Sequence, residues 1–261
     1  MGEVVRMHIE RGVAVVTLTG SDQENALTSA FLRELDRAVR QAADDESCRA
    51  IVLKAQGPAF CQGMDLSIFR HGARPARADL QQFTDCLKHI CRSSRPVMAC
   101  VEGQVSGGGV ALVAACDLVL ASASATFIMP ELVLGLLPAL AAPFLQRRLS
   151  LARIRYLTLS SKTIDASEAR ALGLVDDVVA DMSEAVKPQL QRLLCLSPGA
   201  VAAAKQYFES MDVHDLDRDV DGGLDQAIRW FDSGETLDDL REYAEGGVPS
   251  WFPKGRSARV V

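Results

Sequence analysis

Short blocks of apolar residues with strand or helix spacing divide the first half of the chain. Two β-branched runs, residues 4–9 and 13–18, flank the turn Glu10-Arg11-Gly12, which predicts two paired strands. The next block predicts an amphipathic helix, because its apolar residues recur at helical intervals opposite a face of arginines; they are Phe31, Leu35, Ala38, Val39 and Ala42. Thr28 or Ser29 precedes this helix as its cap.

Strands and helices continue to alternate up to about residue 140. Strands are predicted at residues 50–54, 97–101 and 118–120, and helices at residues 78–91 and 110–115. Alternation with short connections indicates an α/β core with largely parallel strands.

Beyond about residue 143 the pattern is mostly helical. The predicted helices are residues 144–149, 152–159, 167–172, 182–196, 198–210 and 224–230, with one strand at 174–179. Residues 212–221 are rich in aspartate and precede Gly222-Gly223, which indicates a linker or hinge; a solvated acidic helix end is the alternative.

The composition is that of a soluble globular protein able to build a sizeable core. Of 261 residues, 48% are hydrophobic and 24% are charged. The formal charge of −6 argues against a nucleic-acid-binding protein, and no apolar run is long enough to cross a membrane. The N-terminus lacks the features of a signal peptide, so we expect a cytoplasmic protein. Seven scattered cysteines without a C-x-x-C pair predict reduced thiols and no zinc site.

The charge is unevenly distributed along the chain. Residues 212–245 hold 12 acidic and three basic residues, a net charge of −9, and the rest of the chain sums to +3. A mildly basic body offers a docking surface to an acidic partner. The candidate docking residues are Arg70, Arg74, Arg77, Arg147, Arg148, Arg153 and Arg155.

Three stretches contain candidate chemistry. Gly107, Gly108 and Gly109 stand between a strand and an apolar helix, which indicates either close backbone approach to a ligand or a tight crossing between the two elements. The second stretch, residues 59–66, reads AFCQGMDL and follows another short strand. In the third, Glu131 lies between Pro130 and a run of leucines, where burial would raise its pKa towards neutrality; a structural hydrogen-bonding role is the alternative.

In this order and spacing the three stretches resemble the crotonase (enoyl-CoA hydratase/isomerase) superfamily. Further matching motifs are Asn25-Ala26-Leu27, Ala115-Cys116-Asp117 and SEARALGLV at residues 167–175. The resemblance covers nearly the whole chain and implies the crotonase (ClpP-like) fold of the α/β class. It implies a core of repeated β-β-α units in residues 1–195 and a helical C-terminal part in residues 196–261 that takes part in trimerisation, in a homotrimer or a dimer of trimers.

The resemblance also implies a catalytic site. The family stabilises a thioester enolate with two backbone N–H groups, which by position belong to Met64 and Gly108. Glu131 would take the α-proton, and Asp65 is the nearest candidate in sequence for a second proton-transfer group. Candidate substrate-binding residues are Gly63, Gly107, Gly109, Arg70 and Tyr156.

Two departures from the family pattern narrow the choice of activity. Two-glutamate hydratases of the family carry their first glutamate just after the glycine turn, where this chain has Ala111. CoA-binding relatives often have basic residues before the first helix, where residues 21–25 of this chain read SDQEN.

A closer resemblance involves residues 131–148, Tyr156 and residues 192–196 and 205–208. These segments look like the crotonase-type dehydratases of polyketide β-branching cassettes in antibiotic biosynthesis. That resemblance implies dehydration of 3-hydroxy-3-methylglutaryl-acyl carrier protein to the 3-methylglutaconyl thioester. Its substrate would be carried on the phosphopantetheine of an acyl carrier protein, with no other cofactor and no metal.

Three alternatives remain open from the sequence. One is a hydratase or isomerase of CoA thioesters, and another is the decarboxylating partner enzyme of the same cassette. The third is a non-catalytic crotonase-fold binding module, for which Ala111 is the supporting feature.

Overall fold

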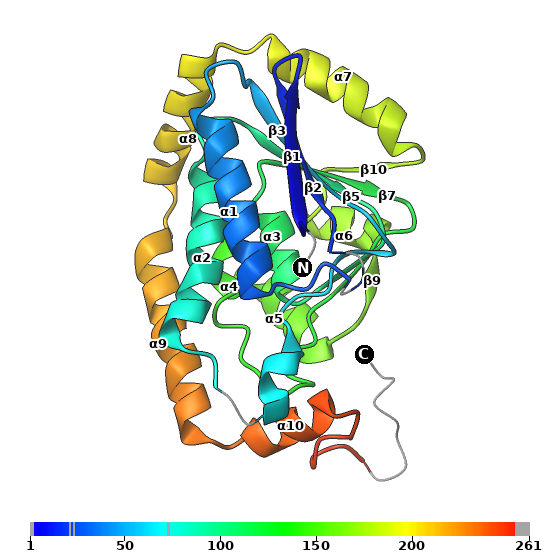
Figure 1. Ribbon diagram of the computed structural model, residues 1–261, viewed down its shortest axis with the longest axis vertical. Coiled ribbons are helices and arrows are strands. Elements are labelled where there is room, and N and C mark those ends of the chain that lie inside the picture. Colours follow the sequence, from blue (N-terminus) through cyan, green and yellow to red (C-terminus); the bar gives the residue numbers. More distant parts are fainter. Residues whose placement is uncertain (1–2, 21, 23, 72–73, 254–261) are drawn as a thin grey trace.

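The computed structural model describes residues 3–20, 22, 24–71 and 74–253, which form two sheets surrounded by helices (Figure 1). The larger sheet has the strand order β1-β2-β3-β5-β7-β10, and its strands are Val5–Glu10, Val13–Leu18, Ala50–Ala55, Val97–Val101, Leu118–Ser122 and Asp177–Val179. The smaller sheet has the order β4-β6-β8-β9, and its strands are Ala59–Cys61, Gln104–Ser106, Thr126–Ile128 and Ile164–Asp165. Neighbouring strands are parallel apart from the pairs β1–β2 and β8–β9.

Consecutive strands alternate between the two sheets. Strands β3, β5 and β7 of the larger sheet are each followed by a strand of the smaller one, and the first two pairs lead into α2 (Arg77–Arg92) and α3 (Gly108–Ala114). A 3-10 turn, η2 (Leu66–His71), lies between β4 and α2. The predicted core of repeated β-β-α units is confirmed. Because β4 and β6 pair in parallel, the segments that follow them leave the smaller sheet at the same edge.

Helix α1 (Ser29–Asp44) illustrates how the sequence pattern becomes packing. The Thr28 hydroxyl accepts a hydrogen bond from Phe31 N at 3.1 Å, so Thr28 is the cap. The predicted apolar stripe is buried, together with Leu32. Helix α3 is almost completely enclosed, since residues 109–114 are all buried.

The remaining helices follow β8. They are α4 (Ala142–Leu145), α5 (Leu151–Ser160), α6 (Ala166–Leu172), α7 (Met182–Leu194), α8 (Pro198–Met211), α9 (Leu216–Ser233) and α10 (Leu237–Ala244). The predicted helix at residues 144–149 was wrong in its bounds, because α4 begins and ends earlier. Helix α8 has no buried residue, and Lys205 Nζ ties it to Asp117 Oδ2 at 2.6 Å. The division between residues 195 and 196, which falls between α7 and α8, stays a prediction.

The acidic segment predicted as a linker is instead mostly helix. Helix α9 begins at Leu216 and continues through both glycines, so the hinge prediction was wrong. It runs beside α2 in Figure 1, where it is drawn in orange. Its buried residues recur at helical spacing and join the main hydrophobic core; they are Leu216, Val220, Leu224, Ala227 and Phe231.

Aspartates of the acidic segment form ion pairs with basic residues of α2. On α2, Arg77 pairs with Asp225 at 2.8 Å, and Arg92 pairs with Asp217 at 2.9 Å. Lys88 also lies 3.3 Å from Asp217. Exposed pairs of this kind each stabilise by no more than about 1 kcal/mol, so burial of the apolar stripe is the main attachment of α9.

The two adjacent glycines of α9 give a matched test of how closely α9 packs on the core. A Cβ on Gly223 would lie 2.3 Å from the backbone oxygen of Ala139, whereas a Cβ on Gly222 would meet nothing within 4 Å. We expect Gly223→Ala to lower the free energy of unfolding by about 1–3 kcal/mol. Gly222→Ala should raise it by about 0.5–1 kcal/mol, because alanine favours helix. Denaturant unfolding measures both, and equal effects would contradict the packing described.

Candidate active site

A cavity of about 630 Å³ lies where the loops after β4 and β6 meet the helical C-terminal part. Five predicted site residues line it, namely Met64, Asp65, Gly107, Gly108 and Glu131. Residues much later in the sequence also line it; they belong to α9 and α10 and are Ala227, Trp230, Phe231 and Tyr243. Much of the remaining lining is apolar, including Leu134, Leu136 and Phe83.

Two glycines in left-handed conformations bring the backbones of the two loops together. Gly63 has φ +83° and Gly107 has φ +51°. A Cβ on Gly63 would lie 2.7 Å from Ser106 O and 3.2 Å from Gly108 N, so only glycine allows this approach. Neither Met64 N nor Gly108 N donates a hydrogen bond to any described residue outside regular helix pairing. The two amides are therefore available to bind an oxygen atom in the cavity.

The predicted glycines Gly63 and Gly109 act through packing and do not themselves line the cavity. A Cβ on Gly109 would lie 2.6 Å from Cys61 O, which fixes the start of α3 against β4. Leu27 N donates to Gly63 O at 2.8 Å and holds the first of the two loops from the other side.

Glu131 is buried at the base of this arrangement. Its Oε2 atom has no hydrogen-bond partner among the described residues. Burial raises the pKa of the carboxyl to about 7, opposed by a hydrogen bond from its own backbone N–H. A Cβ on Gly107 would lie 3.3 Å from Oε1, so the carboxyl packs directly against the glycine turn. A carboxyl with this pKa can both accept and donate a proton near neutral pH.

Both tryptophans of the chain hold the loop that carries Glu131. Trp230 Nε1 donates to Gly135 O at 2.8 Å, and Trp251 Nε1 donates to Val133 O at 3.2 Å. Gly135 has φ +71°, and a Cβ there would lie 2.6 Å from the Trp251 ring. Nothing in the sequence near either tryptophan indicates this contact.

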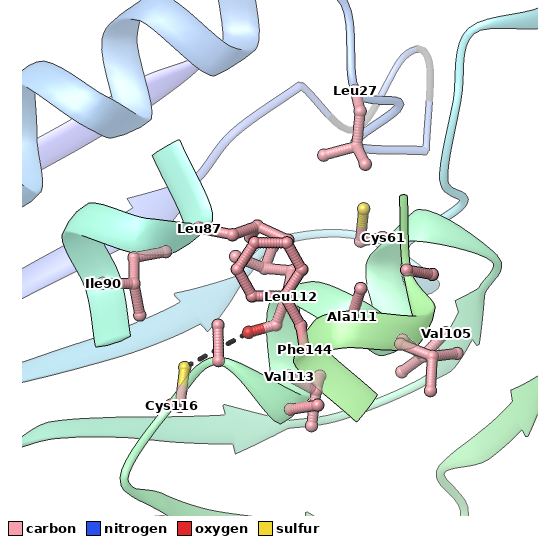
Figure 2. Packing of buried hydrophobic residues seen from close by; sticks show 14 of the residues in the cluster. Leu27, Cys61, Leu87, Ile90, Val105, Ala111, Leu112, Val113, Cys116 and Phe144 are labelled. Carbon is pink, nitrogen blue, oxygen red and sulfur yellow. Dashed lines mark hydrogen bonds between the residues drawn. The ribbon is translucent and has the colours of Figure 1, made fainter. Parts of the chain in front are cut away.

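The position of the family's first glutamate is closed off from the cavity. Ala111 is fully buried and does not line the cavity. Figure 2 shows it within the apolar cluster that includes Cys61, Val105 and Leu112. Burial raises the pKa of the Cys61 thiol to about 12, so the thiol stays protonated near neutral pH.

The structure corrects two predicted substrate contacts. Arg70 does not line the cavity; its Nε donates to Ala244 O at 2.9 Å and joins η2 to the end of α10. Tyr156 is exposed on α5, with its hydroxyl 3.5 Å from Glu168 Oε1, because the buried face of that helix holds Ile154, Leu157 and Thr158.

Asp65 lines the cavity, but its carboxylate is engaged elsewhere. Its Oδ1 accepts a hydrogen bond from Ser67 N at 2.9 Å and so forms the turn that starts η2. Its role in proton transfer stays a prediction.

Most of the arginines considered for docking make contacts within the chain. Arg148 is only 10% exposed in its side chain and lies 3.0 Å from Asp176, so its prediction as a docking residue was wrong. Arg147 pairs with Glu209 at 3.5 Å. Arg153 and Arg155 are exposed on α5 and make no ion pair with the described residues.

Among the residues that the structure describes, no group of three or more His, Cys, Asp or Glu side chains is arranged to hold a metal ion. No described helix has the length and apolar character needed to span a membrane. The seven cysteines are free thiols, of which only Cys195 is exposed.

Comparison with known families accounts for this arrangement. A model of the enoyl-CoA hydratase/isomerase family matches residues 8–253. The chain belongs to this family. The predicted fold and the assignment as a hydro-lyase of the crotonase type are thereby confirmed.

Several members of the family are similar along most of the chain. A protein described as an enoyl-CoA hydratase from Rhizobium meliloti (strain 1021) is 33% identical over 68% of this chain and 69% of its own length. The bacillaene synthase dehydratase PksH of Bacillus subtilis (strain 168) is 26% identical over 95% of this chain and 96% of its own.

Solved structures of the family superpose closely on the chain. The crystal structure of PksH from Bacillus subtilis has a TM-score of 0.88 at 25% identity, covering 97% of this chain and 100% of that one. An enoyl-CoA hydratase from Mycobacterium avium has a TM-score of 0.85 at 26% identity, with 97% and 100% coverage.

Burial of Glu131 predicts a pH-dependent stability. The pKa of this carboxyl is raised in the folded protein, so the unfolded chain loses the proton first as pH rises from 4.5 to about 7, and folding is progressively destabilised over this range. Glu131→Gln removes the titration. We expect the variant to gain up to about 3 kcal/mol relative to the wild type between pH 4 and pH 8. Denaturant unfolding at several pH values measures this, and a stability difference that does not change with pH would contradict the assigned burial.

Proposed function

We propose that the protein dehydrates 3-hydroxy-3-methylglutaryl attached to an acyl carrier protein, giving the 3-methylglutaconyl thioester. The observation that carries the proposal is the lone buried carboxyl of Glu131, combined with Ala111 where two-glutamate hydratases have their first glutamate. The similarity to the bacillaene synthase dehydratase, which extends over 95% of the chain, supports a dehydratase within the family.

In the proposed mechanism Glu131 acts twice. As the carboxylate it removes the α-proton of the thioester, and the electron pair moves onto the thioester oxygen to form an enolate. The N–H groups of Met64 and Gly108 hydrogen-bond that oxygen and contribute a few kcal/mol of transition-state stabilisation. The protonated Glu131 then donates its proton to the departing hydroxyl, the electron pair returns to form the double bond, and water leaves. The carboxylate is restored without a second acid.

A pKa near neutrality suits both halves of this cycle. A carboxylate of ordinary pKa would be a weak base towards the α-proton, and one of much higher pKa would seldom be ionised at neutral pH. Burial raises the pKa of Glu131 to about 7, between these extremes.

Attachment to a carrier protein rather than to free CoA is supported by the charge at the cavity. Glu24 lines the cavity and is exposed, and Asp22 beside it is exposed as well. Ser21 and Gln23 of the same predicted stretch lie outside the described residues. The nucleotide phosphates of CoA would be repelled by these carboxylates, whereas the shorter phosphopantetheine arm leaves its single phosphate on the carrier.

The proposed assembly is a homotrimer or a dimer of trimers. Helix α8 buries none of its residues within the protomer, yet it presents the large apolar side chains of Tyr207, Phe208 and Met211. Such a face is typical of a subunit interface.

The test is to load purified acyl carrier protein with 3-hydroxy-3-methylglutaryl and to follow the loss of one water by intact mass spectrometry. We expect the wild type to dehydrate this substrate, and Glu131→Gln to fold but to lose at least about 100-fold in rate. Glu46→Gln is the matched control, because Glu46 is exposed and makes no side-chain hydrogen bond or ion pair with the described residues.

Each other outcome identifies a different activity. Faster dehydration of the CoA thioester would contradict the carrier assignment. Loss of carbon dioxide would indicate the decarboxylase of the same type of cassette, and no reaction on either carrier would favour the binding module.

A further inference from the structure

One cationic side chain lines the cavity among the residues that the structure describes. It is Arg74, which lies in the segment leading into α2. Four acidic residues line the same cavity, namely Glu24, Asp65, Asp79 and Glu131. A lone cation in a largely apolar cavity indicates that the ligand brings an anionic group of its own.

Arg74 and the loop of Glu131 meet the same turn of the chain. Arg74 Nη1 lies 3.6 Å from Asp232 Oδ1, and Nη2 lies 4.0 Å from the position of a Cβ on Gly234. The same stretch also holds the Glu131 loop, because Trp230 donates to Gly135 O and the Thr236 side chain packs on Gly135. The end of α9 therefore lies against both Arg74 and the loop that carries Glu131.

Arg74 does not lie close enough to Glu131 to pair with it. No ion pair joins the two, and the raised pKa of Glu131 arises from burial without any contribution from a cation. A guanidinium in contact with the carboxyl would lower its pKa. The positive charge is thus held apart from the base, where it can meet the far end of a substrate.

The donors of Arg74 are available for a ligand. Its separation from Asp232 exceeds hydrogen-bond length, and both side chains are about half exposed or more, so this pair is weak. Asp79, the other acid nearby in sequence, uses its carboxylate to accept from Ala76 N at 3.1 Å. A guanidinium presents five N–H donors in a planar fork that matches a carboxylate.

We propose that Arg74 binds the distal carboxylate of the acyl group, so that the enzyme selects acyl thioesters that end in a carboxylate over neutral ones. This inference rests on the proposed function and names the residue that recognises the carboxylate of the substrate. Arg70, which the sequence indicated as a substrate-binding residue, lies outside the cavity.

The experiment compares two substrates that differ only in distal charge: the 3-hydroxy-3-methylglutaryl thioester on carrier protein, and the same thioester with its carboxylate replaced by a carboxamide. The wild type should prefer the carboxylate. Arg74→Gln should lose about 10–100-fold in kcat/KM on the carboxylate and less than about threefold on the carboxamide. Arg74→Lys should recover part of the loss, since it restores the charge without the fork.

Arg229→Gln is the matched control. Arg229 lies on α9, is exposed, makes no ion pair with the described residues and does not line the cavity. It should change neither rate by more than about twofold, as expected for a solvated surface residue. Equal losses on both substrates in Arg74→Gln, or no loss on either, would overturn the proposal.

A binding measurement separates this proposal from the proposed reaction. The 3-methylglutaryl thioester of pantetheine has no leaving hydroxyl, so its affinity can be measured by calorimetry whether or not turnover occurs. If the wild type prefers it over the carboxamide analogue and Arg74→Gln removes the preference, the carboxylate subsite stands even if dehydration fails. Absence of the preference in the wild type would overturn the subsite, whatever the reaction.

Discussion

The buried carboxyl of Glu131, whose Oε2 has no hydrogen-bond partner among the described residues, is the constraint around which the site is organised. Burying an ionisable group with an unsatisfied oxygen costs stability, which the packing of the rest of the fold must offset. In return the pKa of the group moves to about 7. The same carboxyl packs against Gly107, next to the Gly108 amide, and it lines one cavity together with Met64 and Gly108. The proposed acid-base chemistry and the proposed enolate stabilisation thus depend on one packing arrangement.

The C-terminal helices make that enclosure possible. Helix α9 lays its apolar stripe on the core, and Gly223 allows it to touch the backbone at Ala139. From the end of α9 onward, Trp230 and Trp251 fasten the loop that carries Glu131. Residues far from the glycine motifs in sequence therefore determine the position of Glu131, the proposed base. The acidic residues of α9 help to hold it against α2, since its aspartates pair with cations of α2.

The sequence predicted the parts of the site that local pattern determines. The glycine triplet, the Met64 amide and Glu131 are marked by motifs of a few residues, and all of them meet in the structure. Arg70 and Tyr156 were misplaced because the direction of a side chain depends on helix phase and on tertiary neighbours, which spacing alone does not give. The tryptophan contacts join residues 95 and 118 positions apart, and Arg74 faces the cavity only because α9 packs beside it. Likewise, the aspartates and glycines of α9 have low helix propensity. The helix forms nevertheless, because its apolar residues are buried against the core.

The most direct test of the central claim is hydrogen exchange at the α-carbon of a thioester that cannot lose water. The protein is incubated in D₂O with the 3-methylglutaryl thioester on carrier protein, and deuterium incorporation is followed by mass spectrometry. The account predicts exchange whose rate rises with pH through about 7, the pKa of Glu131, and which is abolished in Glu131→Gln. Exchange at the same rate in the variant, or no exchange in the wild type, would contradict the assignment of Glu131 as the base.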